Sequence, residues 1–251
     1  PEIGGAERQL LMLMQGLDRR YYRPHVVCLD GGGSLFDDYN QAAESCVVLN
    51  RGKAFDLRTL QALRLHIQNL QPAIVHTWLY IANLYGSIAT KTTTKVPTIV
   101  SQRGLGIDPQ HSKRKIWQMR VFNRLISLLS NKLLVNAQAV TEPMYQVGFT
   151  PDKTQVIYNG LDLDIQVTAE QQNDLRKELK IQPDEIILAA IARIDPKKDL
   201  ETMLRAFAIV HNQNAKTRLL IAGDGFPNYQ KKLDLLVEQL GIQNQVNFLG
   251  F

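Results

Sequence analysis

The feature that most constrains this fold is a regular alternation of short apolar runs with segments of helical periodicity. The runs are continuous stretches of Val, Ile and Leu, which indicates strands buried on both faces, as in a parallel sheet covered by helices. The predicted strands are 25–29, 46–49, 73–76, 98–100, 132–135, 155–158, 186–192, 219–222 and 245–249. The predicted helices are 6–19, 57–70, 80–92, 112–130, 137–147, 169–180, 198–212 and 228–240.

The alternation pauses once, over a polar stretch that follows residue 163. We therefore predict an α/β protein with a Rossmann-like, doubly wound domain at 1–163, a linker at 164–183 and the first part of a second such domain at 184–251. No strand is predicted ahead of the first helix, and only three strands follow the linker. We expect the chain to be part of a longer protein, without its first strand and the C-terminal part of its second domain.

Composition excludes several classes of protein. The 251 residues are 45% hydrophobic and 21% charged, as in globular domains, and no apolar stretch reaches the ~18 residues of a membrane-spanning helix. Two cysteines, Cys28 and Cys46, cannot form a disulfide framework, and we expect buried thiols in a reducing compartment. Because no Cys/His cluster occurs, no zinc site is predicted, and because neither GxGxxG nor a P-loop occurs, no dinucleotide or ATP cofactor is predicted. These features favour a cytoplasmic protein.

Positive charge is concentrated in the first part of the chain. Residues 1–160 hold 18 of the 29 basic and 11 of the 24 acidic residues. The densest basic segment is the predicted helix 112–130, where apolar and aromatic residues interleave with the cations. Three interpretations stay open: a core helix with a solvated basic face, a helix resting on anionic lipid headgroups, and a nucleic-acid surface. The last is disfavoured because no nucleic-acid-binding module accompanies the charge, so no nucleic-acid partner is predicted.

Phosphate binding is the chemistry that this architecture most readily supplies. Gly4 and Gly5 directly precede the first helix, and Gly223 and Gly225 follow a strand and lead into another helix. Glycines let the backbone approach an anion, and a helix N-terminus presents unpaired N–H groups to it. Arg193 follows strand 186–192 directly, and Lys198 is predicted at the start of the next helix. Ligands bind at the carboxyl ends of parallel strands, where two cations would suit a pyrophosphate.

Five segments, taken together, resemble the motifs of family-4 glycosyltransferases, which are retaining enzymes of the GT-B fold. Gly4-Gly5-Ala6-Glu7 is similar to the family's GGxE, and Val156–Asp162 is similar to VIxNGxD, which includes Asn159 and Gly160. Arg193–Asp199 is similar to the GRLxxxKG/KD segment, Leu220–Gly225 to LxIxGxGP, and Val246–Gly250 to VxFLG. The resemblance spans nearly the whole chain.

The resemblance implies an acceptor on the first domain and a nucleotide-sugar donor, UDP first and GDP second, on the other. Arg193 and Lys198 would act catalytically on the donor diphosphate without a metal. The residues that would contact substrate are Gly4, Gly5, Arg103, Asn159, Gly160, Gly223 and Gly225. The implied acceptor is a polysaccharide or lipid-linked sugar. Helix 112–130 would then place the enzyme on an anionic membrane surface at the inner face of the membrane.

This sequence also departs from the family pattern. Arg103 stands where many members carry a His, and the family's HxH is His76-Thr77-Trp78, without its second His. The family's E-x7-E segment has no counterpart, so we expect the chain on its own to be inactive. Two alternatives are a non-catalytic nucleotide- or sugar-binding remnant and a GT-B nucleotide-sugar epimerase.

Overall fold

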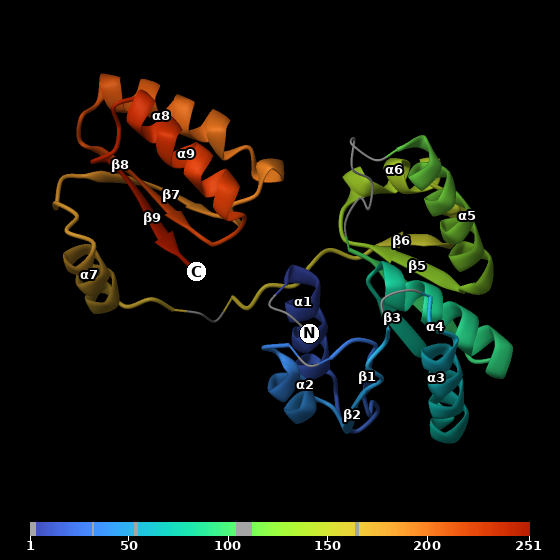
Figure 1. Ribbon diagram of the computed structural model, residues 1–251. Helices are drawn as coiled ribbons and strands as arrows, with labels where there is room; N and C mark the ends of the chain where they lie inside the picture. Colours follow the sequence, from blue (N-terminus) through green and yellow to red (C-terminus); the bar gives the residue numbers. More distant parts are fainter. Residues whose placement is uncertain (1–3, 32, 53–54, 104–111, 164–165) are drawn as a thin grey trace. The chain divides into compact units, whose positions relative to one another are not determined.

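The computed structural model describes residues 4–31, 33–52, 55–103, 112–163 and 166–251. The chain divides into two compact units, Pro1–Leu163 and Asp164–Phe251, and in both the paired strands run parallel. The first unit contains α1 (Gly5–Gly16), β1 (His25–Cys28), α2 (Phe36–Ala42), β2 (Ser45–Val48), α3 (Leu57–Leu70), β3 (Val75–Trp78), α4 (Tyr80–Thr93), β4 (Thr98–Gln102), α5 (Lys113–Leu129), β5 (Lys132–Val135), η1 (Gln138–Val140), α6 (Thr141–Gln146), η2 (Pro151–Lys153) and β6 (Thr154–Val156) (Figure 1).

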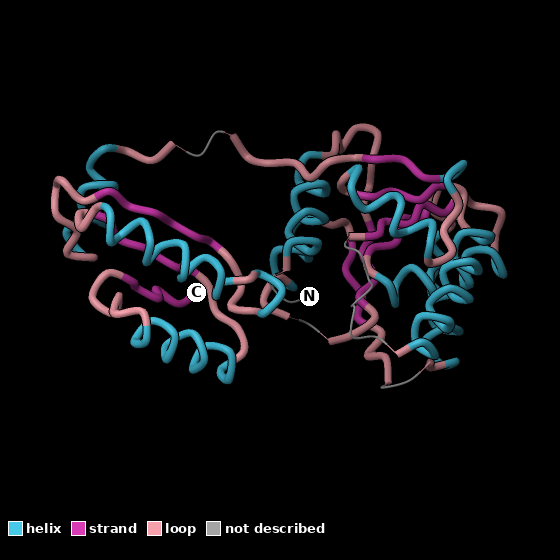
Figure 2. Tube along the Cα trace, turned by 90° about the horizontal axis from the view of Figure 1, so that it is seen from above, coloured by secondary structure: helices cyan, strands magenta, loops and turns pink. Residues whose placement is uncertain are grey.

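The second unit contains α7 (Ala169–Glu178), β7 (Ile186–Ile191), η3 (Pro196–Lys198), α8 (Leu200–Gln213), β8 (Thr217–Ala222), α9 (Pro227–Gln239) and β9 (Val246–Gly250). The strand-helix alternation predicted from the sequence is therefore confirmed, and helices lie against strands in each unit (Figure 2). The predicted linker segment contains α7, whose N-terminus is capped by a capping box between Thr168 and Gln171.

The larger sheet of the first unit has the order β3-β4-β5-β6. Its buried strand residues Val100, Leu133 and Val135 pack with residues from α4, α5 and α6. Strands and helices alternate in sequence, and successive parallel strands are neighbours in the sheet. This arrangement brings the carboxyl ends of β3, β4 and β6 to one edge of the sheet.

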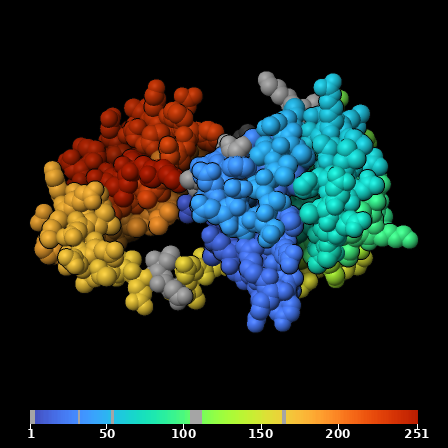
Figure 3. Space-filling model, turned by 90° about the horizontal axis from the view of Figure 1, so that it is seen from below, coloured from blue at the N-terminus to red at the C-terminus, as the bar shows by residue number. Residues whose placement is uncertain are grey.

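A separate two-stranded sheet, β1-β2, has helices on both faces. Val26, Cys28 and Cys46 face a cluster from α1 and α2, whereas Val27 and Leu49 face a cluster from α3 and α4. In the space-filling view, these blue and cyan segments form one continuous body (Figure 3). The continuous apolar run 25–29 is explained, since both sides of the strand are covered.

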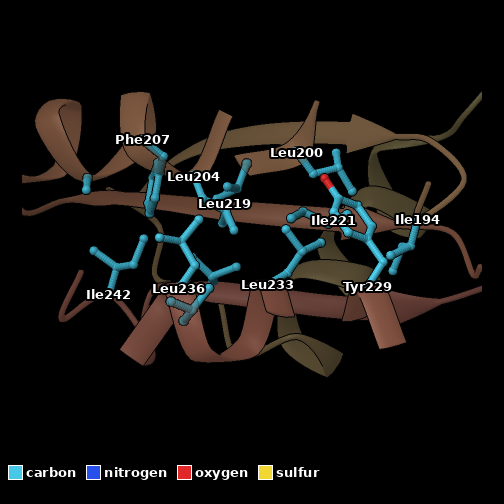
Figure 4. Close-up of a cluster of buried hydrophobic side chains, with 13 residues drawn as sticks. Ile194, Leu200, Leu204, Phe207, Leu219, Ile221, Tyr229, Leu233, Leu236 and Ile242 are labelled. Carbon is cyan, nitrogen blue, oxygen red and sulfur yellow. The ribbon is translucent and has the colours of Figure 1, made fainter. Parts of the chain in front are cut away.

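The core of the second unit lies between its sheet, ordered β7-β8-β9, and the pair α8 and α9. Leu219 and Ile221 of β8 lie among side chains that come from both helices (Figure 4). Leu204, Leu233 and Ile221 are fully buried. This cluster anchors β7 and β8, whose carboxyl ends carry the predicted diphosphate-binding residues.

The structure corrects two expectations about secondary structure in the first unit. The seven-residue helix α2 was not predicted; its sequence FDDYNQA is too short to show helical periodicity, and its N-cap residue Leu35 makes no side-chain cap. Strand β3 spans Val75–Trp78 and ends two residues beyond the predicted run, because Thr77 is buried against α4, where its hydroxyl donates to Asn83, and Trp78 is buried under the Arg103 guanidinium. His76 is consequently an interior strand residue and does not end the strand.

Candidate functional site

Two loops at the carboxyl ends of β7 and β8 continue the pairing of these strands. The Ile194 N–H donates to the Asp224 carbonyl at 2.9 Å, and the Phe226 N–H donates to the Ile194 carbonyl at 3.0 Å. A parallel bridge joins Ile194 to Gly225, and Ile194 is itself buried in the core of the unit. The backbone that carries Arg193 is therefore fixed from both sides.

The glycines of the second loop make this close pairing possible. A Cβ placed on Gly223 would overlap the carbonyl oxygen of Ala192, and one placed on Gly225 would overlap the carbonyl oxygen of Ile194. Gly223 also has φ +144, a conformation that side chains rarely adopt. In this structure the space beside both glycines is occupied by the neighbouring loop. A contact between these glycines and a substrate stays a prediction.

Arg193 leaves the paired loops toward solvent, with its side chain 66% exposed. Its guanidinium donates to Asp195 Oδ2 at 2.8 Å, and the other oxygen of that carboxylate accepts from the Lys197 N–H at 3.0 Å. Asp195 is only 5% exposed, and its pKa is lowered by the Lys197 hydrogen bond and by the charge of Arg193. A buried carboxylate thus orients an exposed guanidinium, an arrangement that the sequence analysis did not identify.

Lys198 does not begin the next helix, contrary to expectation. It is the last residue of η3, and α8 begins two residues later behind the N-cap Asp199, which has φ +49. The Lys198 N–H donates to the Asp195 carbonyl at 2.9 Å, so the turn is fastened to the same residue that holds Arg193. Lys198 lies outside α8 because the Asp195 side chain caps η3, and this cap starts a separate turn ahead of the helix. The Lys198 side chain is exposed and has no ion pair among the described residues.

The first unit contains a second cluster of predicted site residues, where β3 and β4 end. The Arg103 guanidinium lies over the Trp78 ring, 4.0 Å from its centroid, and its Nη1 donates to Asn159 Oδ1 at 2.8 Å. The two predicted residues Arg103 and Asn159 are thus brought together across 56 positions of sequence. Trp78 was not predicted to take part, since stacking between residues that are distant in sequence leaves no local pattern.

His76 lies beside this stack on the same strand as Trp78. The two rings are 5.1 Å apart between centroids, and His76 Nε2 is 2.8 Å from Ser101 Oγ. Burial, together with the positive charge of Arg103, lowers the pKa of His76 to about 4. The imidazole is therefore neutral near pH 7 and adds no charge to the cluster.

A buried amide supports the ends of these strands from below. Asn83, on α4, accepts from Thr77 Oγ1 at 2.8 Å and donates to the Ser101 carbonyl and to Gln102 Oε1, both at 3.2 Å. Asn83 is fully buried, so the network fixes the carboxyl ends of β3 and β4 relative to α4. A polar residue within an apolar helical segment was the only sequence signal for it.

Helix α1 is joined to the loop that follows β6. Gln9 Nε2 donates to the Gly160 carbonyl and Gln9 Oε1 accepts from the Gly160 N–H, both at 2.8 Å. Gly4 is the N-cap of α1 and has the Glu7 carboxylate beside it, whereas Gly5 has open space where a Cβ would stand. The structure therefore brings the helix that begins at Gly4 and Gly5 to the loop that holds Asn159.

The described part of the chain has no group of three or more His, Cys, Asp and Glu residues able to hold a metal ion. Over the same residues, no helix combines the length and hydrophobicity that crossing a bilayer requires.

Solved structures define the class of fold. The chain superposes on Anabaena HepE in complex with UDP with a TM-score of 0.82 at 22% identity, covering 99% of this chain and 66% of HepE. A glycosyltransferase from Rickettsia africae gives a TM-score of 0.79 at 16% identity, over 99% of this chain and 65% of its own. Two Rossmann-like units with this likeness make the fold that of the GT-B glycosyltransferases.

Sequence comparison identifies the family. Residues 3–165 match Glycosyltransferase Family 4, and residues 171–251 match Glycosyl transferases group 1. The chain belongs to glycosyltransferase family 4.

Curated relatives include an uncharacterized glycosyltransferase of Methanocaldococcus jannaschii, 33% identical over 49% of this chain. Another is a D-inositol 3-phosphate glycosyltransferase of a Mycobacterium species, 26% identical over 70% of this chain. The matches span 32% and 41% of these two proteins, respectively.

Proposed function

We propose that the protein transfers a sugar, with retention of configuration, from a UDP-sugar to a polysaccharide or lipid-linked acceptor. The observation that carries this proposal is the pair of cations Arg193 and Lys198 on one structured turn at the carboxyl end of β7. Membership of family 4 supports it, as do the HepE structures, which contain UDP and UDP-glucose.

In the proposed reaction, the bond between the sugar C1 and the diphosphate oxygen breaks while a bond from C1 to the acceptor oxygen forms. The acceptor proton passes to the departing phosphate. Arg193 and Lys198 neutralise the charge that develops on that group, and a single preorganised donor of this kind contributes ~3–4 kcal/mol. Cations on a rigid turn supply the role that a metal ion has in other transferases, so the proposal includes no metal.

The test is a UDP-release assay with UDP-glucose, run with and without a saccharide or lipid-linked acceptor. It compares the 251-residue chain with the product of the complete open reading frame. We expect UDP release that depends on acceptor in the complete product and no turnover in the chain alone. Product analysis without acceptor separates an epimerase, which would convert the sugar unaided. UDP-sugar binding without turnover in the complete product would favour a non-catalytic role.

We further propose that α5 places the protein on an anionic membrane surface at the cytoplasmic side. This helix contains five basic residues and no acidic one, and its exposed side presents Trp117 and Leu128, both 63% exposed. Lys113, Arg114 and Arg124 lie on the same helical face as these two residues. Apolar side chains between cations suit the boundary between headgroups and acyl chains. Each cation near such a surface contributes ~1 kcal/mol.

A vesicle-binding experiment tests the proposed membrane surface. The chain should sediment with phosphatidylglycerol vesicles and not with phosphatidylcholine vesicles. Lys113→Glu/Arg114→Glu should reduce binding at least about tenfold, since two attractive charges of ~1 kcal/mol each are reversed. Arg205→Glu/Lys231→Glu, two exposed cations of the second unit, is the control with the same change in net charge. Equal losses in both variants would mean that net charge, and not α5, governs binding.

A further inference from the structure

The Arg103 cluster, defined as Trp78, Arg103 and Asn159, holds a positive charge that no described residue nearby balances. Arg103 stacks on Trp78, and it donates a hydrogen bond to the neutral amide oxygen of Asn159. No carboxylate pairs with this guanidinium among the described residues, and His76 beside it is neutral. Burial lowers the pKa of Arg103. A partly buried arginine is usually paired with an anion, because desolvation of its charge is costly.

Two donors of the cluster also lack acceptors. Arg103 Nε–H and Trp78 Nε1–H are both buried, and neither has a hydrogen-bond partner among the residues that the structure describes. Trp78 as a whole is only 8% exposed. Leaving a buried donor unpaired is costly, so two unpaired donors on stacked side chains point to a ligand. A ligand that supplies acceptor oxygens and negative charge would satisfy both deficits at once.

The surroundings of the cluster hold it ready for such a ligand. Asn159 adjoins Gly160, whose N–H and carbonyl are both bound by Gln9, so the amide that orients Arg103 sits on a fastened loop. Asn83 holds the strand ends from the other side. A planar guanidinium fixed on an aromatic ring can present two N–H groups to one oxyanion. The proposed function places the nucleotide diphosphate at Arg193 in the other unit, so the oxyanion at Arg103 would come from a different molecule.

We propose that the Arg103 cluster binds an oxyanion, a phosphate or carboxylate group, of the acceptor. The assignment to the acceptor rests on the proposed transfer reaction, whereas the oxyanion site itself stands without it. Family resemblance placed only a generic sugar contact at Arg103. The chemistry of the cluster narrows the substrate class to acceptors that carry a negative charge.

Trp78 itself can report binding at the Arg103 cluster through its fluorescence. The chain has two tryptophans, so Trp117→Phe leaves Trp78 as the single tryptophan. In this background we would titrate glucose 6-phosphate, glucuronate and glucose at constant ionic strength and follow Trp78 fluorescence. We expect a saturable change with at least one of the two anionic sugars and none with glucose. Tighter binding of glucose 6-phosphate would indicate a site for a phosphate group, and tighter binding of glucuronate a site for a carboxylate group.

Variants decide whether Arg103 is responsible. Arg103→Gln should raise the dissociation constant for the anionic sugar at least tenfold, and circular dichroism checks that this variant is folded. Arg103→Lys keeps the charge but lacks the planar fork, so its dissociation constant should lie between those of the parent and Arg103→Gln. Arg58→Gln, which removes an exposed cation of the same unit, should change it less than twofold. An identical response to glucose and to the anionic sugars, or an Arg103→Gln variant that binds as tightly as its parent, would overturn the proposal. Because no nucleotide is present, failure here is separable from failure of the transfer reaction.

Discussion

Arg193→Ala will weaken UDP binding by about 1.5–3 kcal/mol, the usual contribution of a hydrogen bond to a charged group. That loss corresponds to a dissociation constant roughly 10- to 150-fold higher. The reason is local: Asp195 and the paired loops hold the guanidinium in place before ligand arrives, so its interaction with a diphosphate costs little ordering. Isothermal titration calorimetry with UDP measures the change.

The control for this prediction is Arg205→Ala, which removes an exposed arginine from α8 in the same unit. It should leave UDP affinity within about twofold of the parent value. Arg193→Lys should recover part of the loss, because the charge is kept while the fork-shaped donor is lost. If UDP binds equally well to Arg193→Ala and to the parent, Arg193 does not contact the nucleotide and the donor site lies elsewhere.

Gly223→Ala will destabilise the second unit by about 2–6 kcal/mol. A methyl group would overlap the carbonyl oxygen of Ala192, and overpacking of this kind costs about 1–3 kcal/mol. The positive φ of Gly223 adds about 1–3 kcal/mol of backbone strain. Gly225→Ala, which lacks the positive φ, should cost only the overlap with Ile194.

Gly241→Ala is the matched control, since Gly241 also has a positive φ, +69, but has nothing within 4 Å of its Cβ position. It should cost about 1–3 kcal/mol, the strain alone. Both tryptophans lie in the first unit, so fluorescence would not report on the second; hydrogen exchange of the β8 amides would. Equal protection in Gly223→Ala and Gly241→Ala would show that the loops separate easily and do not hold Arg193 rigidly.

The order of strands and helices could be predicted because burial on both faces imposes continuous apolar runs, as at 25–29, where the two faces pack on different helices. Boundaries were less accurate at two places. Packing of Thr77 against α4 and of Trp78 against Arg103 extends β3 beyond its apolar run, which is a tertiary effect. Asp195 accepts from the Lys197 N–H and makes a turn of the residues expected to begin α8, which is a local hydrogen bond that competes with the helical pattern.

The candidate site was predictable to a similar degree. Motif likeness made Arg193 and Asn159 candidates, whereas Arg103 was chosen by its position after a strand where many family members carry a His. The residues that orient them, Asp195 for Arg193 and Trp78 for Arg103, act through contacts that sequence does not display. The predicted contacts of these cations with substrate stay predictions.

The link between Gln9 and Gly160 joins residues 151 positions apart, near the first and last elements of the first unit. A chain is synthesised from its N-terminus, so α1 leaves the ribosome long before the residue that fastens it. Contacts of such long range also slow folding, since a large loop must close before they form. The link between Asn159's loop and α1 is therefore made in the last stage of this unit's biogenesis, and a nascent chain halted before residue 160 has α1 packed on β1 and α2 but lacks this link.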